Sequence, residues 1–296
     1  MISTYVRRLR LASELTALRQ LRKVSSDQLA RTAGLPRTTV SRLENARMRP
    51  DPDDVMRILQ ALDIVDGERW LQITTIAREA SERGWWESWA NEMGTRQALY
   101  ANLEAGAASI REYQMTFLPG LLQTSAFSEQ RAQIDKADWS SRFDPTRAVE
   151  ARERRQRMLR RPDGPDYEVV IDQLAIRRPA VTLDVLHVQL AHIADLAAVD
   201  RKITVKVLPI DARIDGLSVP RSGFSIYTYP DPGDPVVVAV DTVTDDLVLT
   251  NPDAVSHYLE LYTRLKAAAL TGLDSIRLLR NTAAEPGKLT STGTAA

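Results

Sequence analysis

The tightest constraint on the fold of this chain is a short segment in which two helices must meet at a sharp turn. Ser25 and Gln28 form a capping box, in which the serine hydroxyl and the glutamine side chain satisfy free amides at a helix start. Gly34 ends that helix, because the left-handed conformation of a helix C-cap is costly for a residue with a side chain. Pro36 then suits the first turn of a second helix, where its missing amide is not needed. The segment therefore predicts two short helices with almost no loop between them.

The second of these helices has an apolar face and a polar face. Val40 and Leu43 stand at helical spacing and are expected to point inward. The outward faces carry polar and basic side chains, namely Arg37, Thr38, Ser41 and Arg42. The major groove of DNA admits one helix, and an arginine there can donate two hydrogen bonds to guanine. The pattern is thus typical of a helix-turn-helix that reads DNA.

Charge is distributed unevenly along the chain. The 296 residues hold 39 basic and 39 acidic side chains, so the formal net charge is zero. Residues 1–50 carry 11 Lys or Arg against 3 acids, a net +8, which leaves 28 against 36, a net −8, for residues 51–296. A basic segment joined to an acidic remainder favours a polyanion-binding surface at the N-terminal end.

Composition and motifs narrow the remaining function classes. The chain has no cysteine, which excludes disulfides and thiolate metal sites, and no apolar run reaches the ~18 residues that a membrane helix needs. His187 and His192 stand five apart, whereas a shared metal face on a helix favours positions i and i+4. A GxSxG element, a P-loop and a GxGxxG turn after a strand are also lacking. We therefore expect a cytoplasmic protein that is not an enzyme and has no metal, no cofactor and no membrane contact.

The remainder of the chain mixes strands and helices. Strand patterns are expected at residues 109–115, 167–172, 203–208, 223–229, 236–241 and 246–249. Helical patterns are expected at residues 11–24, 67–83, 125–136, 145–160, 182–199, 252–269 and 273–279. The fold class is therefore α+β, with an all-α N-terminal domain followed by an α+β domain that contains a mixed sheet. The expected domains are residues 1–83 for DNA binding, residues 84–282 for dimerisation or regulation, and residues 283–296 as a disordered tail.

Two features of the second domain allow more than one interpretation. Trp85, Trp86 and Trp89 fit a packed seam between the domains or a ligand-binding box, and the seam is favoured. Residues 147–161 carry seven arginines and two glutamates. They could contact DNA beside the operator or an acidic partner, or they could form a solvated helix face with local ion pairs.

The string LRQLRKVSSDQLARTAGLPRTTVSRLENARMRP, from about Leu18 to Pro50, closely resembles the Xre-type helix-turn-helix family, which includes the phage repressors. A further helix follows at residues 53–62. The match keeps the Leu29-Ala30 pair, the turn glycine and the closing proline. The resemblance implies a five-helix, lambda-repressor-like domain that binds double-stranded DNA.

The same resemblance implies roles for individual residues. Arg37, Thr38 and Arg42 fall where side chains that read bases sit. The positions at or near phosphates are those of Ser26, Thr39, Ser41, Asn45 (through its backbone amide), Arg47 and Arg49. Arg19 and Glu44 match a buried ion pair that fixes the recognition helix, although two solvated charges are the alternative. The family often has glutamine where this chain has Ser26, whose shorter side chain reaches less far towards a phosphate.

The C-terminal part resembles a domain of poorly defined function that follows the helix-turn-helix in many actinobacterial Xre-family regulators, sometimes described as toxin–antitoxin-like. The resemblance covers about residues 85–280. It is most specific at PGLLQT, which starts at Pro119, and at the RRQ run that ends at Gln156. It implies a regulator often encoded beside a small partner protein.

These observations lead to one main hypothesis and one alternative. One helix-turn-helix covers only a few base pairs, so we expect a homodimer on a two-fold operator. The second domain would then receive a signal from a ligand or a partner protein. The alternative is an antitoxin-like protein that sequesters a small partner and represses its own operon.

Overall fold

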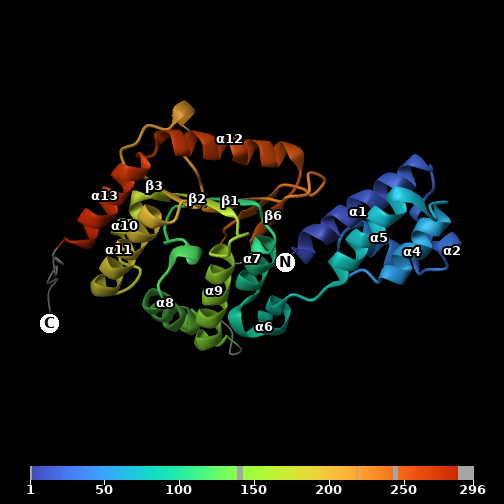
Figure 1. Ribbon diagram of the computed structural model, residues 1–296, viewed down its shortest axis with the longest axis horizontal. Helices are drawn as coiled ribbons and strands as arrows, with labels where there is room; N and C mark the ends of the chain where they lie inside the picture. The colour runs from blue at the N-terminus through green and yellow to red at the C-terminus, as the bar shows by residue number, and fades with distance from the viewer. Residues whose placement is uncertain (1, 139–142, 218, 243–245, 286–296) are drawn as a thin grey trace, which may run out of the picture.

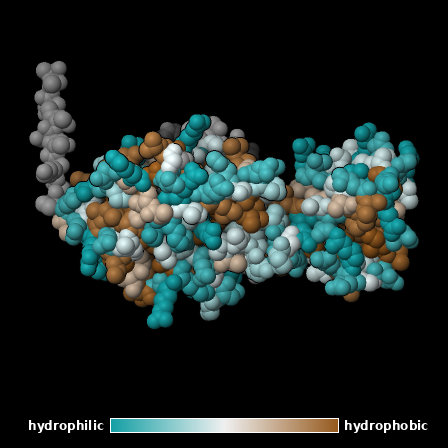
Figure 2. All heavy atoms as spheres, turned by 90° about the horizontal axis from the view of Figure 1, so that it is seen from above, coloured by the Kyte–Doolittle hydropathy of each residue, from teal (hydrophilic) through white to brown (hydrophobic). Residues whose placement is uncertain are grey.

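The computed structural model describes residues 2–138, 143–217, 219–242 and 246–285. It consists of a small helical body and a larger body built on a sheet (Figure 1). The two bodies meet at a narrow waist, and hydrophilic residues cover much of the face drawn in Figure 2. Within the described residues, no helix is both long and apolar enough to cross a membrane.

The small body is a bundle of five helices. They are α1 (Thr4–Leu21), α2 (Ser26–Ala33), α3 (Arg37–Glu44), α4 (Pro52–Ala61) and α5 (Gly67–Ser81). Leu11, Leu15 and Leu18 of α1 pack with apolar residues of the other four helices in one core cluster. The all-α N-terminal part expected from the sequence is therefore confirmed.

The turn between α2 and α3 forms as the sequence predicts. The Ser25 hydroxyl accepts the Gln28 amide, and the Gln28 side chain accepts the Ser25 amide, so both halves of the capping box are made. Gly34 has φ 64° and ψ 32°, and the Leu35 amide reaches back to the Ala30 carbonyl at 2.9 Å. These bonds satisfy the carbonyls at the end of α2 and aim the chain into α3 within three residues.

Helix α1 begins at Thr4, well before the expected start at residue 11. Its first turn is held by contacts that are remote in sequence. The Ser3 hydroxyl and the Tyr5 amide both donate to the Asn102 side chain at 3.1 Å, and Val6 is buried in the core of the large body. One continuous helix therefore contributes to the cores of both bodies.

The large body contains a six-stranded sheet in the order β3-β2-β1-β4-β5-β6. The strands are β1 (Ser109–Gln114), β2 (Asp166–Asp172), β3 (Ile203–Leu208), β4 (Phe224–Thr228), β5 (Val237–Val240) and β6 (Leu247–Leu249). The first three strands are parallel to one another, and β4, β5 and β6 add antiparallel pairs. The mixed sheet and all six expected strands are thus confirmed.

Helices cover both faces of this sheet. They are α6 (Trp85–Met93), α7 (Thr95–Glu104), α8 (Ser125–Asp138), α9 (Pro145–Leu159), α10 (Gln173–Arg177), α11 (Leu183–Val199), α12 (Pro252–Ala268) and α13 (Gly272–Ala283), with short 3-10 turns η1 (Gly120–Leu122) and η2 (Asp215–Leu217). Helix α12 lies over one face, and most of the other helices lie on the opposite side (Figure 1). Successive side chains of a strand point to opposite faces of the sheet, so each face has its own apolar core. On β2, Val169 and Ile171 belong to one core and Val170 belongs to the other.

The tryptophans of α6 pack mainly inside the large body. Trp86 is buried with Met93, Ala101 and Met158, which belong to α6, α7 and α9. Helix α6 also takes part in the seam between the two bodies, because Trp86 lines a pocket with Arg8 and Arg49, and the neighbouring Glu87 pairs with Arg49. At the C-terminal end α13 runs to Ala283, and residues 286–296 of the expected tail lie outside the described part.

Candidate nucleic-acid interface

Helix α3 presents a polar surface to solvent over an apolar base. Val40 is fully buried and Leu43 is 3% exposed, in the core that α1 and α2 complete. The side chains on the other faces are exposed, and they are those of Arg37, Thr38, Ser41 and Arg42. The two faces predicted from the sequence are therefore present, and packing fixes the direction in which the polar face points.

An ion pair links α3 to α1. The Arg19 Nε lies 2.5 Å from a Glu44 carboxylate oxygen, and the glutamate side chain is only 9% exposed. Arg19 also donates to the Val24 carbonyl at 3.1 Å, and the Ser26 hydroxyl donates to Glu44 at 3.4 Å. The pair thus ties together the three helices that orient the recognition surface, instead of standing as two solvated charges.

The three side chains expected to read bases differ in their surroundings. Arg42 and Thr38 are exposed, and neither has a side-chain hydrogen bond or ion pair within the described part of the chain. The Arg37 Nε lies 2.6 Å from Asp27 of α2, in a pair whose side chains are 75% and 48% exposed. Such an exposed pair contributes little, so DNA can replace Asp27 as the partner of Arg37.

The residues expected near phosphates differ in exposure, and some of them already have hydrogen-bond partners within the chain. Ser41 and Arg47 are exposed, and Thr39 is half-buried. The Asn45 amide already donates to the Ser41 carbonyl at 3.2 Å, and its side chain donates to the same carbonyl at 2.7 Å. A phosphate at that position would have to compete with the last turn of α3.

Arg49, also expected near a phosphate, contacts the large body. Its guanidinium pairs with Glu87 of α6, and both side chains are about one-third exposed, at 32% and 30%. Arg8 lies in the same electrostatic environment, where burial lowers its pKa, Glu87 raises it and Arg49 lowers it further. The expected phosphate contact and the contact between the bodies therefore involve the same arginine.

A second set of charges at the waist was not anticipated from the sequence. Arg7 of α1 pairs with Glu79 of α5 at 2.8 Å and with Asp231 and Asp234 of the β4–β5 connection at 2.9 Å each. Burial opposes the charge of Arg7, yet the hydrogen bond to Asp231 and the nearby carboxylates raise its pKa. The only sequence signal was the basic run near the N-terminus, which gives no indication of these partners.

The described residues were also compared with the geometry that a metal ion needs. Within the described ranges, no group of three or more His, Asp or Glu side chains is arranged to hold a metal ion. His192, one of the two histidines considered above, has a pKa lowered by burial and by Arg160, with Asp195 opposing. The interface itself consists of the arginine and hydroxyl side chains that α3 exposes to solvent.

Comparison with known families agrees with this geometry. A family model described as a helix-turn-helix domain matches residues 10–71, which include α2 and α3, and this domain suggests a DNA-binding regulator. A second model, described as a domain of unknown function (DUF5753), matches residues 97–281. No curated protein and no solved structure matches the chain. The second match covers more than half of the chain, so the chain belongs to the DUF5753 family. Its helix-turn-helix domain precedes the DUF5753 domain.

Proposed function

We propose that this chain is a sequence-specific transcriptional regulator of the Xre type that acts on DNA in the cytoplasm. The observation that carries the proposal is the exposed face of α3, where Arg37, Thr38 and Arg42 stand over a rigid apolar base. Arginine in the major groove discriminates guanine through paired hydrogen bonds. The proposal involves no catalytic step.

Phosphate contacts would position the domain, and base contacts would specify the sequence. Base reading falls to Arg37, Thr38 and Arg42, whereas the backbone contacts fall to Ser26, Thr39, Ser41, Asn45, Arg47 and Arg49. The side chains of Arg42 and Arg47 are both exposed and have no hydrogen bond or ion pair within the described residues, so both are available to DNA. Arg49 would leave Glu87 to reach a phosphate, which would couple DNA binding to the contact between the two bodies.

A homodimer on a two-fold operator forms part of the proposal. An eight-residue α3 spans only a few base pairs, so two copies are needed for useful specificity. The large body would supply the dimer contact and receive a signal from a ligand or a protein.

The alternative is an antitoxin-like protein that sequesters a small partner and represses its own operon. The observation that favours a protein contact is a set of exposed apolar side chains on the paired helices α11 and α13, where Val188 is 62%, Val199 84% and Leu273 72% exposed. Purification of the natively expressed chain would distinguish the two. A stoichiometric small companion supports the alternative, and a dimer alone supports the regulator.

The proposed function is tested by selecting fragments of genomic DNA with the unaltered chain, with Arg42→Ala and Arg47→Ala, and with one control variant. The unaltered chain is expected to recover a two-fold motif. Arg42→Ala is expected to lose ~1–3 kcal/mol on the operator and to relax one base position, whereas Arg47→Ala weakens all sequences alike. Arg277→Ala, which removes a solvent-exposed arginine from α13, is the matched control. Equal losses on operator and random DNA for Arg42→Ala would contradict the base-reading role.

A further inference from the structure

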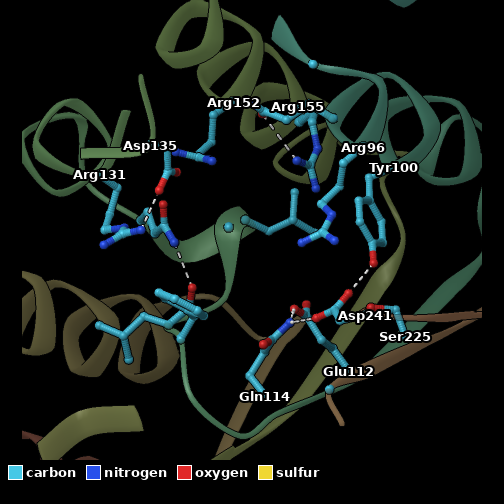
Figure 3. A pocket seen from close by; sticks show the side chains of 18 of the residues that line it. Arg96, Tyr100, Glu112, Gln114, Arg131, Asp135, Arg152, Arg155, Ser225 and Asp241 are labelled. Carbon is cyan, nitrogen blue, oxygen red and sulfur yellow. Dashed lines mark hydrogen bonds and ion pairs between the residues drawn. The ribbon is translucent and has the colours of Figure 1, made fainter. Parts of the chain in front are cut away.

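The large body contains a cavity of about 630 Å³ between the sheet and helices α7, α8 and α9 (Figure 3). Its volume is in the range of small-molecule sites, which is roughly 300–1,000 Å³. Acidic and amide side chains project from the sheet, and arginines project from the helices opposite them (Figure 3). The cavity therefore has an acidic sheet end and an arginine-rich helix end, and Arg221, which precedes the fourth strand, and Asp135 of α8 line it as well.

The sheet end holds two carboxylates without a cationic partner. Tyr167 donates to Glu112 at 2.5 Å and Gln114 donates to it at 2.8 Å. The same Gln114 amide lies 3.3 Å from Asp241, which also accepts the Tyr100 hydroxyl. All these donors are neutral, and within the described residues no lysine, arginine or histidine forms an ion pair with either acid. Burial raises the pKa of Glu112 to about 7, although the hydrogen bonds from Tyr167 and Gln114 oppose the shift.

Glycine keeps this end of the cavity open. A side chain at position 223 would place its Cβ 2.8 Å from the Asp241 carboxylate and 3.2 Å from the Gln114 side chain. Because Gly223 carries no side chain, the two polar groups stay accessible to a molecule inside the cavity.

The helix end contains four arginines, three of which have acidic partners. Arg155 contacts Glu104 at 2.6 and 2.8 Å, Arg131 contacts Asp135 at 2.5 Å, and Arg96 contacts Asp246 at 3.0 Å. These pairs account for the charges of their members. The fourth arginine, Arg152, has no such partner.

Arg152 is a half-buried cation in the wall of the cavity. Its Nε is sealed from solvent, and the guanidinium has no hydrogen bond or ion pair within the described ranges. Burial and the neighbouring Arg155 lower its pKa to about 10, although the nearby Asp135 carboxylate opposes the shift, so the side chain remains charged at neutral pH. A half-buried guanidinium that faces a cavity and has no hydrogen-bond partner of its own is suited to bind an anionic group of a ligand.

Apolar side chains also line the cavity. They include Met93, Met115, Phe117, Leu118, Leu121 and Phe143. The 3-10 turn η1 brings the backbone of Gly120 beside the arginines, since a Cβ there would lie 3.8 Å from the Arg152 Nε. Gln156 of α9 fixes this turn by donating to the Gly120 and Gln123 carbonyls at 3.1 and 2.7 Å.

From this arrangement we propose that the cavity binds a zwitterionic small molecule of the amino-acid-derivative or short-peptide class. Its anionic group pairs with Arg152, its apolar body occupies the middle, and its ammonium group contacts Asp241 and Glu112. The inference deepens the proposed function by naming the kind of signal that the large body receives. Ligand binding itself is independent of the DNA contact.

The test uses three matched compounds with the full chain and without DNA. L-leucyl-L-leucine carries both charges, its N-acetyl form keeps only the anion, and its C-terminal amide keeps only the cation. Thermal unfolding and titration calorimetry are expected to show that the dipeptide binds and that each blocked form binds more weakly. If none of the three binds, or if all three bind equally, the proposed ligand class is wrong.

Arg152→Gln supplies the decisive variant, with Arg157→Gln on the exposed face of the same helix as control. Arg152→Gln is expected to weaken dipeptide binding roughly 30-fold or more, because it removes the cation that pairs with the ligand's anionic group. It is also expected to raise the unfolding midpoint of the free protein, since an unpaired charge disappears. A lowered midpoint would mean that Arg152 is structural and would overturn the inference.

The two proposals fail in distinguishable ways. If the dipeptide binds but neither the unaltered chain nor its variants select any DNA motif, the proposed function fails and the cavity stands. If a DNA motif is recovered but Arg152→Gln binds the dipeptide as the unaltered chain does, the cavity inference fails alone.

Discussion

Helix α3 carries two arginines and α9 carries five, and the two helices place them in opposite environments. Arg42 of α3 is exposed and unpaired within the described residues, so water solvates its charge at little cost. Arg155 of α9 is 7% exposed and lies in a two-bond contact with Glu104. The comparison teaches that the number of arginines in a helix does not indicate its partner, because the packing around each guanidinium decides whether it awaits a polyanion or completes an interior pair.

The arginines of residues 147–161 fall into two groups with different surroundings. Arg147 and Arg154 lie over the ring of Trp89, and Arg147 also pairs with Glu150 at 2.9 Å. These two fit a solvated face with local pairs. Arg152 and Arg155 instead face the cavity, which none of the three interpretations predicts.

Among the substitutions that test this difference between exposed and buried arginines, Arg155→Ala is expected to cause the largest loss of folding stability. It leaves the buried Glu104 without its cation, and breaking a buried pair costs about 3–5 kcal/mol. Urea unfolding should show this loss, whereas Arg157→Ala on the exposed face should stay within about 0.5 kcal/mol. Equal effects of the two substitutions would remove the distinction between the faces of α9.

A second effect concerns the enclosed acid at the opposite end of the cavity. Burial raises the folded-state pKa of Glu112 from 4.5 to about 7, so the folded chain keeps a proton that the unfolded chain releases. The stability from this group is therefore fully present below the unfolded pKa and is lost as pH rises through the folded value. Relative to Glu112→Gln, the unaltered chain should lose up to roughly 3 kcal/mol between about pH 5 and 8.

Chemical unfolding across that pH interval measures the effect. Glu129→Gln on α8, where the side chain is exposed, serves as control and should leave the pH profile unchanged. Parallel pH profiles for the unaltered chain and Glu112→Gln would show that the acid titrates normally.

The smallest expected effect concerns the exposed ion pair between Arg37 of α3 and Asp27 of α2. Asp27→Asn frees Arg37 from its contact on α2, and exposed pairs contribute ~0.2–1 kcal/mol. DNA affinity should rise by that small amount, measured by fluorescence anisotropy at two salt concentrations. A loss of affinity would mean that Asp27 positions Arg37 for DNA.

The sequence predicted those parts of the fold that depend on neighbouring residues. The α2–α3 turn follows from a capping box and Gly34, and the strands follow from β-branched runs with turn residues between them. The early start of α1 was missed because Asn102, which holds its first turn, is 97 residues beyond Tyr5. Periodicity carries no information about such partners.

The candidate sites show the same contrast. The recognition surface is built from one short helix, so its exposed face could be read from residue spacing. The cavity joins segments that are far apart in sequence, and Arg155 lies 51 residues from Glu104. The PGLLQT and RRQ strings stood out as a resemblance, yet only the structure brings Gly120 and Gln156 into contact.

Helix α1 determines how the recognition surface is aimed. Its first turns are fixed in the large body around Val6, and its later turns carry Leu15 and Arg19, which hold α3 in place. A rotation of those first turns therefore changes the direction of α3 by the same angle, because no flexible joint interrupts the helix. In a dimer, the separation of the two recognition helices would be set by packing around Val6, far from any base, so a mutation there would alter the preferred spacing of operator half-sites and leave the bases read within each half-site unchanged.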